Sequence, residues 1–280
     1  MRKTVRKGLS WVLLVVFLTS GSLLIWNFIR SRQGEQSYAD ARTLAAAPAE
    51  LPEPAEEAAA PVTEPPEETR AGTCWVPAPV EEDDPNISAL EQMDLEALRQ
   101  VNGDVLGWIQ IPGTKVDYPL LQGEDNQFYL EHNWKGKKEY VGSIFLEYSN
   151  SPDLMDYNTI LYGHNMSNGT MFGSLRQYRY GNHWKKHPYV YILCGAGVLR
   201  YEVFSTYTAQ VDSLTYGLSF RQMQTRAEFL AMALENSEID TGIVPELTDQ
   251  ILTLSTCSGA GYSTRRVVHA RLKMVEAELT

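Results

Sequence analysis

Two short tracts of this 280-residue chain carry residue types that suit nucleophilic catalysis. Cys257 follows the β-branched, apolar run 250–256 and precedes the turn residues 258–261, so we expect it at a strand exit where a thiol can reach solvent. His164 follows a second apolar run, 159–162, after a single glycine. The chain thus offers a nucleophile and a base or acid, each at the end of a predicted strand.

A cation completes this set of residue types. Arg265 and Arg266 begin the next β-branched run, eight residues after Cys257. A cysteine attacks acyl carbons as the thiolate, and a nearby imidazole favours that form and moves protons. An arginine donates hydrogen bonds to the oxygen that becomes negative in a tetrahedral intermediate. Together these groups indicate acyl transfer, although adjacent strand residues point to opposite faces, so only one arginine suits the role.

Several motifs occur in one frame along the chain, and together they resemble those of sortases, the membrane-bound cysteine transpeptidases of Gram-positive bacteria, specifically class B. The resemblance covers roughly residues 86 to 275. The motifs are DVLGWI at 104–109, IPGT at 111–114, DYPL at 117–120, DNQFYL at 125–130, YGHNM at 162–166, TLSTC at 253–257 and RRVVHA at 265–270.

The resemblance implies a mechanism. Cys257 attacks the threonine carbonyl of a sorting motif near the C-terminus of an exported protein and forms a thioacyl intermediate. His164 protonates the leaving amine and later deprotonates the incoming one. The catalytic arginine of the family stands five positions before an alanine, and counting back from Ala270 selects Arg265. Arg266 then occupies a usually apolar position, so an exchange of the two roles stays open.

The resemblance also implies a substrate groove. Period-two alternation independently places Ser255 on the strand face of Cys257. The loop 212–220, which carries the groove candidate Tyr216, varies in length within such folds. The implied acceptor is an amine of the peptidoglycan cross-bridge or of its lipid-linked precursor, and no cofactor, metal or nucleic acid is implied. The sorting motif, the client protein, the acceptor and the oligomeric state stay open. The residues at groove positions are Asn126, Leu130, Tyr162, Ser255 and Tyr216.

Three alternatives to cell-wall anchoring stay open. A pilin-polymerising sortase would use a lysine of another subunit, but many such enzymes carry an Asp-Pro-aromatic lid, and here Asn86 follows Asp84 and Pro85. Net hydrolysis would use water as the acceptor. An anchored binding module would keep the fold without turnover.

The elements that position these residues are expected to form a mainly β fold, a closed eight-stranded, antiparallel-rich barrel. A capping box at 88–91 and apolar residues at 90, 93, 97 and 101 predict an opening helix or helix pair. Apolar residues at 223, 227, 230 and 234 predict a further helix between the sixth and seventh strands. The predicted strands are 107–111, 117–121, 143–145, 158–162, 189–193, 199–207, 250–256 and 266–272.

The N-terminus predicts a membrane anchor. Residues 9–29 are almost wholly apolar and uncharged, long enough to cross a bilayer, and the basic segment 1–8 precedes them. This asymmetry places the N-terminus in the cytoplasm and the rest outside the cell. A cleaved signal peptide is the alternative, but the apolar run is too long for a typical signal core.

An acidic linker is expected at 30–85, followed by the catalytic domain at 86–280. From Ser37 to Asp84 there are twelve acidic residues against two arginines, so most of the net charge of −11 lies here. A tract dominated by Ala, Pro and Glu buries too little apolar surface to offset the entropy of ordering, which predicts a disordered spacer.

The remaining cysteines and histidines predict no further chemistry. Three cysteines in an exported chain do not form a disulfide framework. Cys194 lies in an apolar run, and Cys74 has no evident role. His183 and His187 share helical spacing but lack a third metal ligand. We expect His132 and His269 to be structural or surface residues, with His269 a possible neighbour of the site because it shares a strand face with Arg265.

Overall fold

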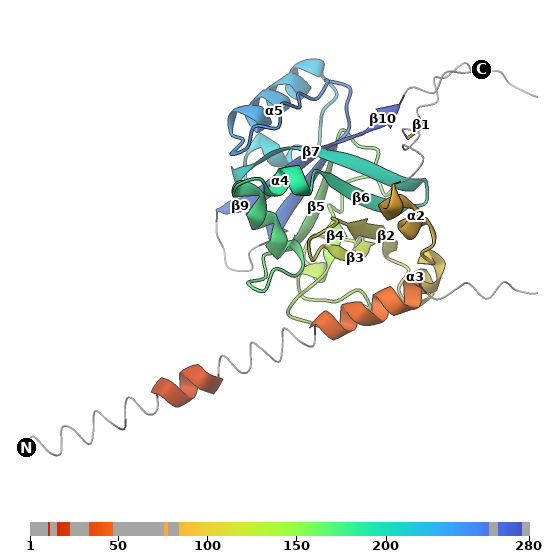
Figure 1. Ribbon diagram of the computed structural model, residues 1–280, viewed down its shortest axis with the longest axis vertical. Helices are drawn as coiled ribbons and strands as arrows, with labels where there is room; N and C mark the ends of the chain where they lie inside the picture. The colour runs from red at the N-terminus through yellow and green to blue at the C-terminus, as the bar shows by residue number, and fades with distance from the viewer. Residues whose placement is uncertain are drawn as a thin grey trace, which may run out of the picture.

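The computed structural model describes residues 11, 16–22, 34–46, 76–77, 84–257 and 263–275. Eight strands form a closed barrel, as predicted, and their order around it is β2-β3-β4-β5-β8-β9-β7-β6 (Figure 1). Every predicted strand is present, within a few residues of the expected bounds. The barrel strands are β2 (Val105–Gln110), β3 (Asp117–Leu121), β4 (Ile144–Leu146), β5 (Asn158–His164), β6 (Tyr189–Cys194), β7 (Gly197–Gln210), β8 (Ile251–Cys257) and β9 (Thr264–Leu272).

Two of the barrel's pairings are parallel, β3 with β4 and β5 with β8, and the other six are antiparallel. The long excursion between β5 and β8 includes β6, β7 and a helix, which returns the chain to run alongside β5 in the same direction. The ends of β5 and β8 therefore lie side by side, although about ninety residues separate them in the sequence.

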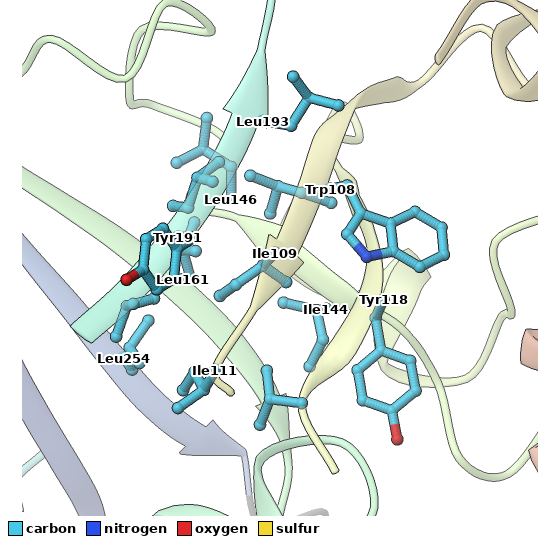
Figure 2. Close-up of a cluster of buried hydrophobic side chains, with 14 of the residues drawn as sticks. Trp108, Ile109, Ile111, Tyr118, Ile144, Leu146, Leu161, Tyr191, Leu193 and Leu254 are labelled. Carbon is cyan, nitrogen blue, oxygen red and sulfur yellow. The ribbon is translucent and has the colours of Figure 1, made fainter. Parts of the chain in front are cut away.

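The barrel interior is filled by branched aliphatic and aromatic side chains (Figure 2). Ile109, Ile144 and Leu161 are fully buried and come from three different strands. Trp108, the neighbour of Ile109 on β2, points to the opposite face of the strand, where it is also fully buried and donates from Nε1 to Asp117 Oδ1 at 2.7 Å (Figure 2). This interior fixes the strand register on which the site depends.

The helix pair that opens the barrel begins earlier than predicted. It consists of α2 (Pro85–Glu91) and α3 (Leu95–Val101). Asp84, assigned by sequence to the disordered linker, caps α2 by accepting from the Asn86 N–H at 3.0 Å, and a proline follows it at the first helical position. Asp84 also pairs with Arg200 on β7 at 3.5 Å. The boundary at residue 86 was therefore two residues too late.

Part of the predicted linker is ordered. Residues 34–45 form a helix that lies along the barrel beside α3, drawn in orange in Figure 1. Tyr38, Ala41 and Ala45 are buried against the barrel, and Trp134 donates from Nε1 to the Ser37 carbonyl at 2.8 Å. Three small or aromatic residues at helical spacing provide the buried face that the acidic, alanine-rich composition concealed. The prediction of disorder is wrong for this stretch.

Other parts of the N-terminal predictions fall largely outside the described residues. Residues 76–77 form the short strand β1 (Val76–Pro77), which pairs with β10 (Met274–Val275). Of the predicted anchor at 9–29, residues 11 and 16–22 are described, and these are helical. Within the described part of the chain, no helix is both long and apolar enough to span a bilayer.

The predicted extra helix is α5 (Met223–Glu235), between β7 and β8. Its buried face differs from the predicted stripe, because Phe229, Leu230 and Ala233 are buried while Met223 is exposed. Phe229 packs edge-on against Phe220, with ring centroids 5.2 Å apart, in a second apolar cluster outside the barrel. The short helices that complete the fold are η1 (Phe128–Leu130), η2 (Phe172–Arg179), α4 (His183–Lys186) and η3 (Leu214–Tyr216).

Candidate active site

Three neighbouring strands bring the predicted catalytic residues to one end of the barrel. His164 is the last residue of β5 and Cys257 the last residue of β8, and the two are paired in the parallel ladder. On the other side of β8, the antiparallel pairing with β9 runs to Ser255 and Val267. Continuing this antiparallel pairing by two residues sets Cys257, at the end of β8, opposite Arg265, near the start of β9. The backbone thus sets a thiol-bearing residue between a histidine and an arginine.

His164 is held by a backbone carbonyl. Its Nε2 lies 2.6 Å from the carbonyl oxygen of Leu130, at the end of η1, and its ring is half-buried. A carbonyl oxygen can only accept, so Nε2 carries the proton in this contact and Nδ1 is the nitrogen that can exchange one. Leu130, predicted as a groove residue, therefore contacts the catalytic histidine through its backbone.

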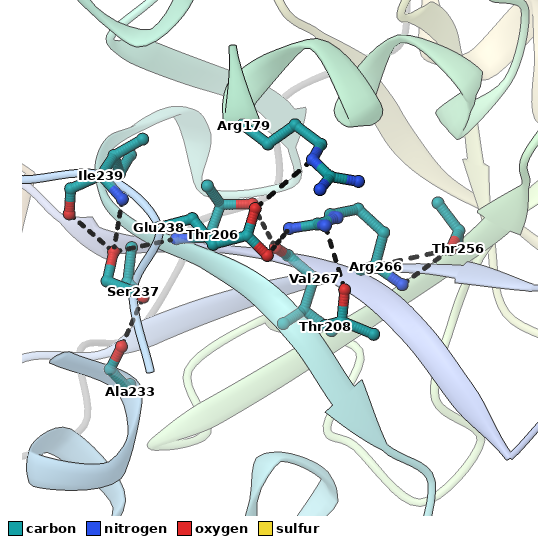
Figure 3. A network of polar contacts seen from close by, with 11 residues as sticks. Arg179, Thr206, Thr208, Ala233, Ser237, Glu238, Ile239, Thr256, Arg266 and Val267 are labelled. Atoms are coloured by element: carbon teal, nitrogen blue, oxygen red, sulfur yellow. Dashed lines mark hydrogen bonds and ion pairs between the residues drawn. The ribbon is translucent and has the colours of Figure 1, made fainter. Parts of the chain in front are cut away.

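The two arginines lie in different surroundings. Arg266 is 9% exposed, and its guanidinium binds Glu238 Oε1 at 2.9 Å and Thr208 Oγ1 at 3.0 Å (Figure 3). Glu238 also pairs with Arg179 at 3.5 Å. Arg265 is only half-buried and donates from Nη1 to the carbonyl of Thr264 at 2.9 Å. Arg266 is thus held in a structural ion pair, which leaves Arg265 as the better candidate for chemistry.

Two predicted groove residues meet on a carboxylate that the sequence analysis missed. Glu147 follows β4 directly and is 5% exposed. Its Oε2 accepts from Asn126 Nδ2 at 2.6 Å and from the Tyr162 hydroxyl at 2.9 Å. The Asn126 side-chain oxygen accepts in turn from the Tyr148 N–H at 3.0 Å. An acidic residue immediately after a wholly apolar strand was the available signal, because a carboxylate at such a position is buried only when it is paired.

The other two predicted groove residues also touch each other. Ser255 is fully buried, and its Oγ lies 2.9 Å from the hydroxyl of Tyr216 on η3. The loop that carries Tyr216 is anchored by Asn158, whose Nδ2 donates to the carbonyls of Thr215 and Gly217 at 3.1 and 2.9 Å. The structure therefore links Asn126 to Tyr162 through Glu147, pairs Tyr216 with Ser255, and sets the Leu130 carbonyl on His164.

The remaining histidines lie away from this centre. His269 is fully buried between Thr253 Oγ1 and the Tyr207 hydroxyl, and burial lowers its pKa to about 3, so its ring is neutral. The rings of His183 and His187 lie 4.4 Å apart. In the described ranges no three metal-binding side chains gather in one place.

One further histidine and two cysteines were predicted to have no part in the chemistry. His132 lies on the surface side of η1, where its ring stacks on Phe128 at 4.0 Å. Cys194 is buried in β6, and burial raises the pKa of its thiol, as suits a small apolar strand residue. Cys74 lies outside the described residues.

Comparison with known proteins gives one consistent family. The sortase domain family matches residues 109–273, which include His164, Cys257 and Arg265. A sortase B of Listeria monocytogenes is 35% identical over 172 residues, 61% of this chain and 70% of the relative. A sortase B of Staphylococcus aureus is 33% identical over 174 residues, 62% of this chain and 71% of that protein. The solved Staphylococcus aureus sortase B-substrate complex is 33% identical, with a TM-score of 0.62 over 65% of this chain and 85% of the other.

Proposed function

The chain belongs to the sortase family, as a class B cysteine transpeptidase, and we propose that Cys257, His164 and Arg265 are its catalytic residues. The observation that carries the proposal is their placement at one end of the adjacent strands β5, β8 and β9, with His164 and Cys257 directly paired. Paired residues of neighbouring strands lie about 4.8 Å apart along the sheet and point to the same face, so the imidazole and the thiol can approach each other for proton exchange.

In the first half-reaction the Cys257 sulfur bonds to the carbonyl carbon of the threonine in the sorting motif, and the bond from that carbon to the next residue's nitrogen breaks. The departing amine takes its proton from His164. Arg265 stabilises the negative oxygen of the tetrahedral intermediate, where a permanently charged donor lowers the barrier. The product is a thioester between Cys257 and the shortened protein.

In the second half-reaction an amine attacks the thioester carbon and the bond to sulfur breaks. His164, now neutral, removes the proton from the attacking amine and so returns to its starting protonation state. We propose that this amine belongs to the peptidoglycan cross-bridge or its lipid-linked precursor. The thiol–imidazole pair and the arginine supply all the proton transfers and charge stabilisation that these steps need.

The substrate is proposed to be an exported protein with a C-terminal sorting signal. The related Staphylococcus aureus protein was solved as a sortase B-substrate complex, which supports binding of such a signal in the corresponding groove. In this chain that groove would be lined by the pair Asn126 and Tyr162 on Glu147 and by the pair Tyr216 and Ser255. The particular sorting motif depends on the shape of these walls.

We further propose that the chain is a single-pass membrane protein with its barrel outside the cell. The support is the uncharged apolar run 9–29 after a basic N-terminus. The helix at 34–45 would then lie just outside the bilayer, and only a short segment would separate the barrel from the membrane.

Product analysis tests the proposed function. The full-length chain in detergent is incubated with peptides that carry different sorting motifs, with and without an oligoglycine amine. We expect cleavage after the threonine and, with the amine present, a ligated product that replaces the free acid. Free acid alone at all amine concentrations would instead indicate net hydrolysis. Ligation only to a lysine of another protein subunit would indicate a pilin-polymerising enzyme, and no cleavage by the folded, reduced chain would favour a binding module.

A further inference from the structure

The helix at 34–45 reaches the surroundings of His164 through one buried hydroxyl. Tyr38 is 1% exposed, and its ring packs edge-on against Tyr118 at 5.0 Å. Its hydroxyl donates to the Gly142 carbonyl at 2.6 Å and lies 3.0 Å from Ser143 Oγ. Burial raises the pKa of Tyr38, so the hydroxyl stays protonated and keeps its ability to donate.

The Gly142–Ser143 turn is tied in turn to the segment that carries Leu130. The Ser143 N–H donates to the Tyr129 carbonyl at 2.9 Å, and Ser143 Oγ donates to the His132 carbonyl at 2.8 Å. These bonds flank Leu130 on both sides. The position of the Leu130 carbonyl therefore follows the position of the turn.

The same turn also packs directly on the hydrogen bond between Leu130 and His164. Gly142 has a φ of +58°, and a side-chain carbon added to it would lie 2.6 Å from the Leu130 oxygen and 3.0 Å from Cδ2 of His164. Only glycine fits there, because the backbone of the turn closes on both partners of the bond. Any shift of Gly142 must move the Leu130 carbonyl or the imidazole.

We propose that Tyr38 is a positioning residue for the reaction: by holding the Gly142–Ser143 turn, it keeps the Leu130 carbonyl on Nε2 of His164. This inference rests on the proposed role of His164. The carbonyl contact fixes the ring's tautomer and orientation and leaves Nδ1 as the exchanging nitrogen. The helix at 34–45 thereby becomes part of the support of the catalytic site.

The variant Tyr38→Phe tests this role, because it keeps the ring and its packing and removes only the hydroxyl. Tyr178→Phe is the matched control: Tyr178 is also fully buried, and its hydroxyl also donates to a backbone carbonyl, that of His187, at 2.8 Å. Both variants lose one buried hydrogen bond of the same kind, so their losses in stability should be similar. Only the Tyr38 bond leads to His164.

Two measurements on the full-length chain in detergent distinguish the roles. The first is the ring nitrogen chemical shift of His164 Nε2 by NMR of labelled histidine, which reports its hydrogen bond to the Leu130 carbonyl, with the signal assigned by His164→Gln among the five histidines of the chain. The second is the split between kcat and KM for a cleaved peptide. We expect Tyr38→Phe to move this signal towards that of a weaker hydrogen bond and to lower kcat on the order of fivefold, with KM nearly unchanged, as loss of one supporting hydrogen bond implies. Tyr178→Phe should leave both at the wild-type values.

An unchanged His164 Nε2 signal in folded Tyr38→Phe would overturn the proposal, whether or not kcat falls, because the loss would then arise elsewhere. If Tyr38→Phe does not fold, Ser143→Ala removes the other hydroxyl of the contact and must shift the same signal. The NMR measurement needs no turnover. Failure of the wild type to process any peptide would therefore count against the proposed function, while the NMR signal would still decide the role of Tyr38.

Discussion

His164 and Cys257 are paired residues at the last positions of two parallel strands, β5 and β8. Because the register of a parallel ladder is fixed by the packing of the barrel interior, the histidine and the cysteine are aligned by the fold and not by a flexible loop. The antiparallel neighbour β9 brings Arg265 to the same end. The two arginines, Glu147 in the groove, the buried His269 and Asp84 at the start of α2 can each be tested separately.

Substitution of the two adjacent arginines should have different effects, one on turnover and the other on stability. Arg265→Ala is expected to lower kcat by about 100-fold or more with little loss of stability, since it removes a donor to the developing oxyanion. Arg266→Ala should instead lower the free energy of unfolding by about 2 kcal/mol, because it breaks the charged hydrogen bond to Glu238 and the hydrogen bond to Thr208. Peptide kinetics and urea unfolding of both variants check this. Loss of turnover in a stable Arg266→Ala protein, with Arg265→Ala active, would exchange the roles.

Glu147 should govern substrate binding and not the chemical step. Glu147→Gln weakens the two hydrogen bonds that orient Asn126 and Tyr162, so we expect KM to rise on the order of tenfold while kcat changes little. Steady-state kinetics with the preferred peptide measure this. Asp156→Asn is the control, because Asp156 also accepts two hydrogen bonds, from Asn150 and Ser151, in a loop outside the groove. Equal effects of the two variants on KM would argue against a groove role for Glu147.

His269 should make the fold sensitive to acid. Its pKa is about 3 in the folded protein and 6.5 as its ordinary value, so the unfolded chain binds one more proton between those pH values. Stability must therefore fall as the pH drops from 6.5 towards 3, by up to about 1.4 kcal/mol per unit from this residue. His269→Gln, which keeps polar atoms near Thr253 and Tyr207, should lose less stability over that range. Denaturant unfolding across pH would show parallel curves for the two proteins if His269 does not contribute.

Asp84 should stabilise the domain from within the predicted linker. Burial alone would raise its pKa, but hydrogen bonds from Tyr191 and Asn86 and the charge of Arg200 outweigh this and lower it. Asp84→Ala removes the cap of α2 and a largely buried ion-pair partner, and we expect a loss of about 2 kcal/mol at neutral pH. Because the pKa is lowered on folding, the carboxylate stabilises the fold above its ordinary pKa of 3.8 and loses this effect as the pH falls below it. Thermal unfolding at pH 7 and at acid pH should show the difference between the two proteins shrink, and a constant difference would contradict this account.

The barrel strands could be predicted because alternation, β-branched residues and turn residues are local properties of the sequence. The adjacency of β5, β8 and β9 could not be derived in that way, since it depends on pairings between distant segments. The resemblance of the motifs grouped Cys257, His164 and Arg265 as one site without giving the strand order. Glu147 was missed for the same reason: its partners Asn126 and Tyr162 lie on other elements. Local patterning finds strands, whereas contacts between them need the fold.

The helix errors have a different cause. Alanine contributes little to an apolar pattern, so the buried face of Tyr38, Ala41 and Ala45 was hidden in an Ala-, Pro- and Glu-rich tract. In α5 the predicted stripe began at Met223, which is exposed, because the helix buries its second half around Phe229. In both cases tertiary packing selected the buried face, and the composition of the segment did not reveal it.

The most direct test of the central claim is the intact mass of the full-length chain after brief incubation with sorting-motif peptides in the absence of an amine. The account predicts a mass increase equal to the N-terminal part of one peptide, located on Cys257, absent from Cys257→Ala and released by hydroxylamine as expected of a thioester. An adduct on another residue, or the same cleavage by folded Cys257→Ala, would contradict it.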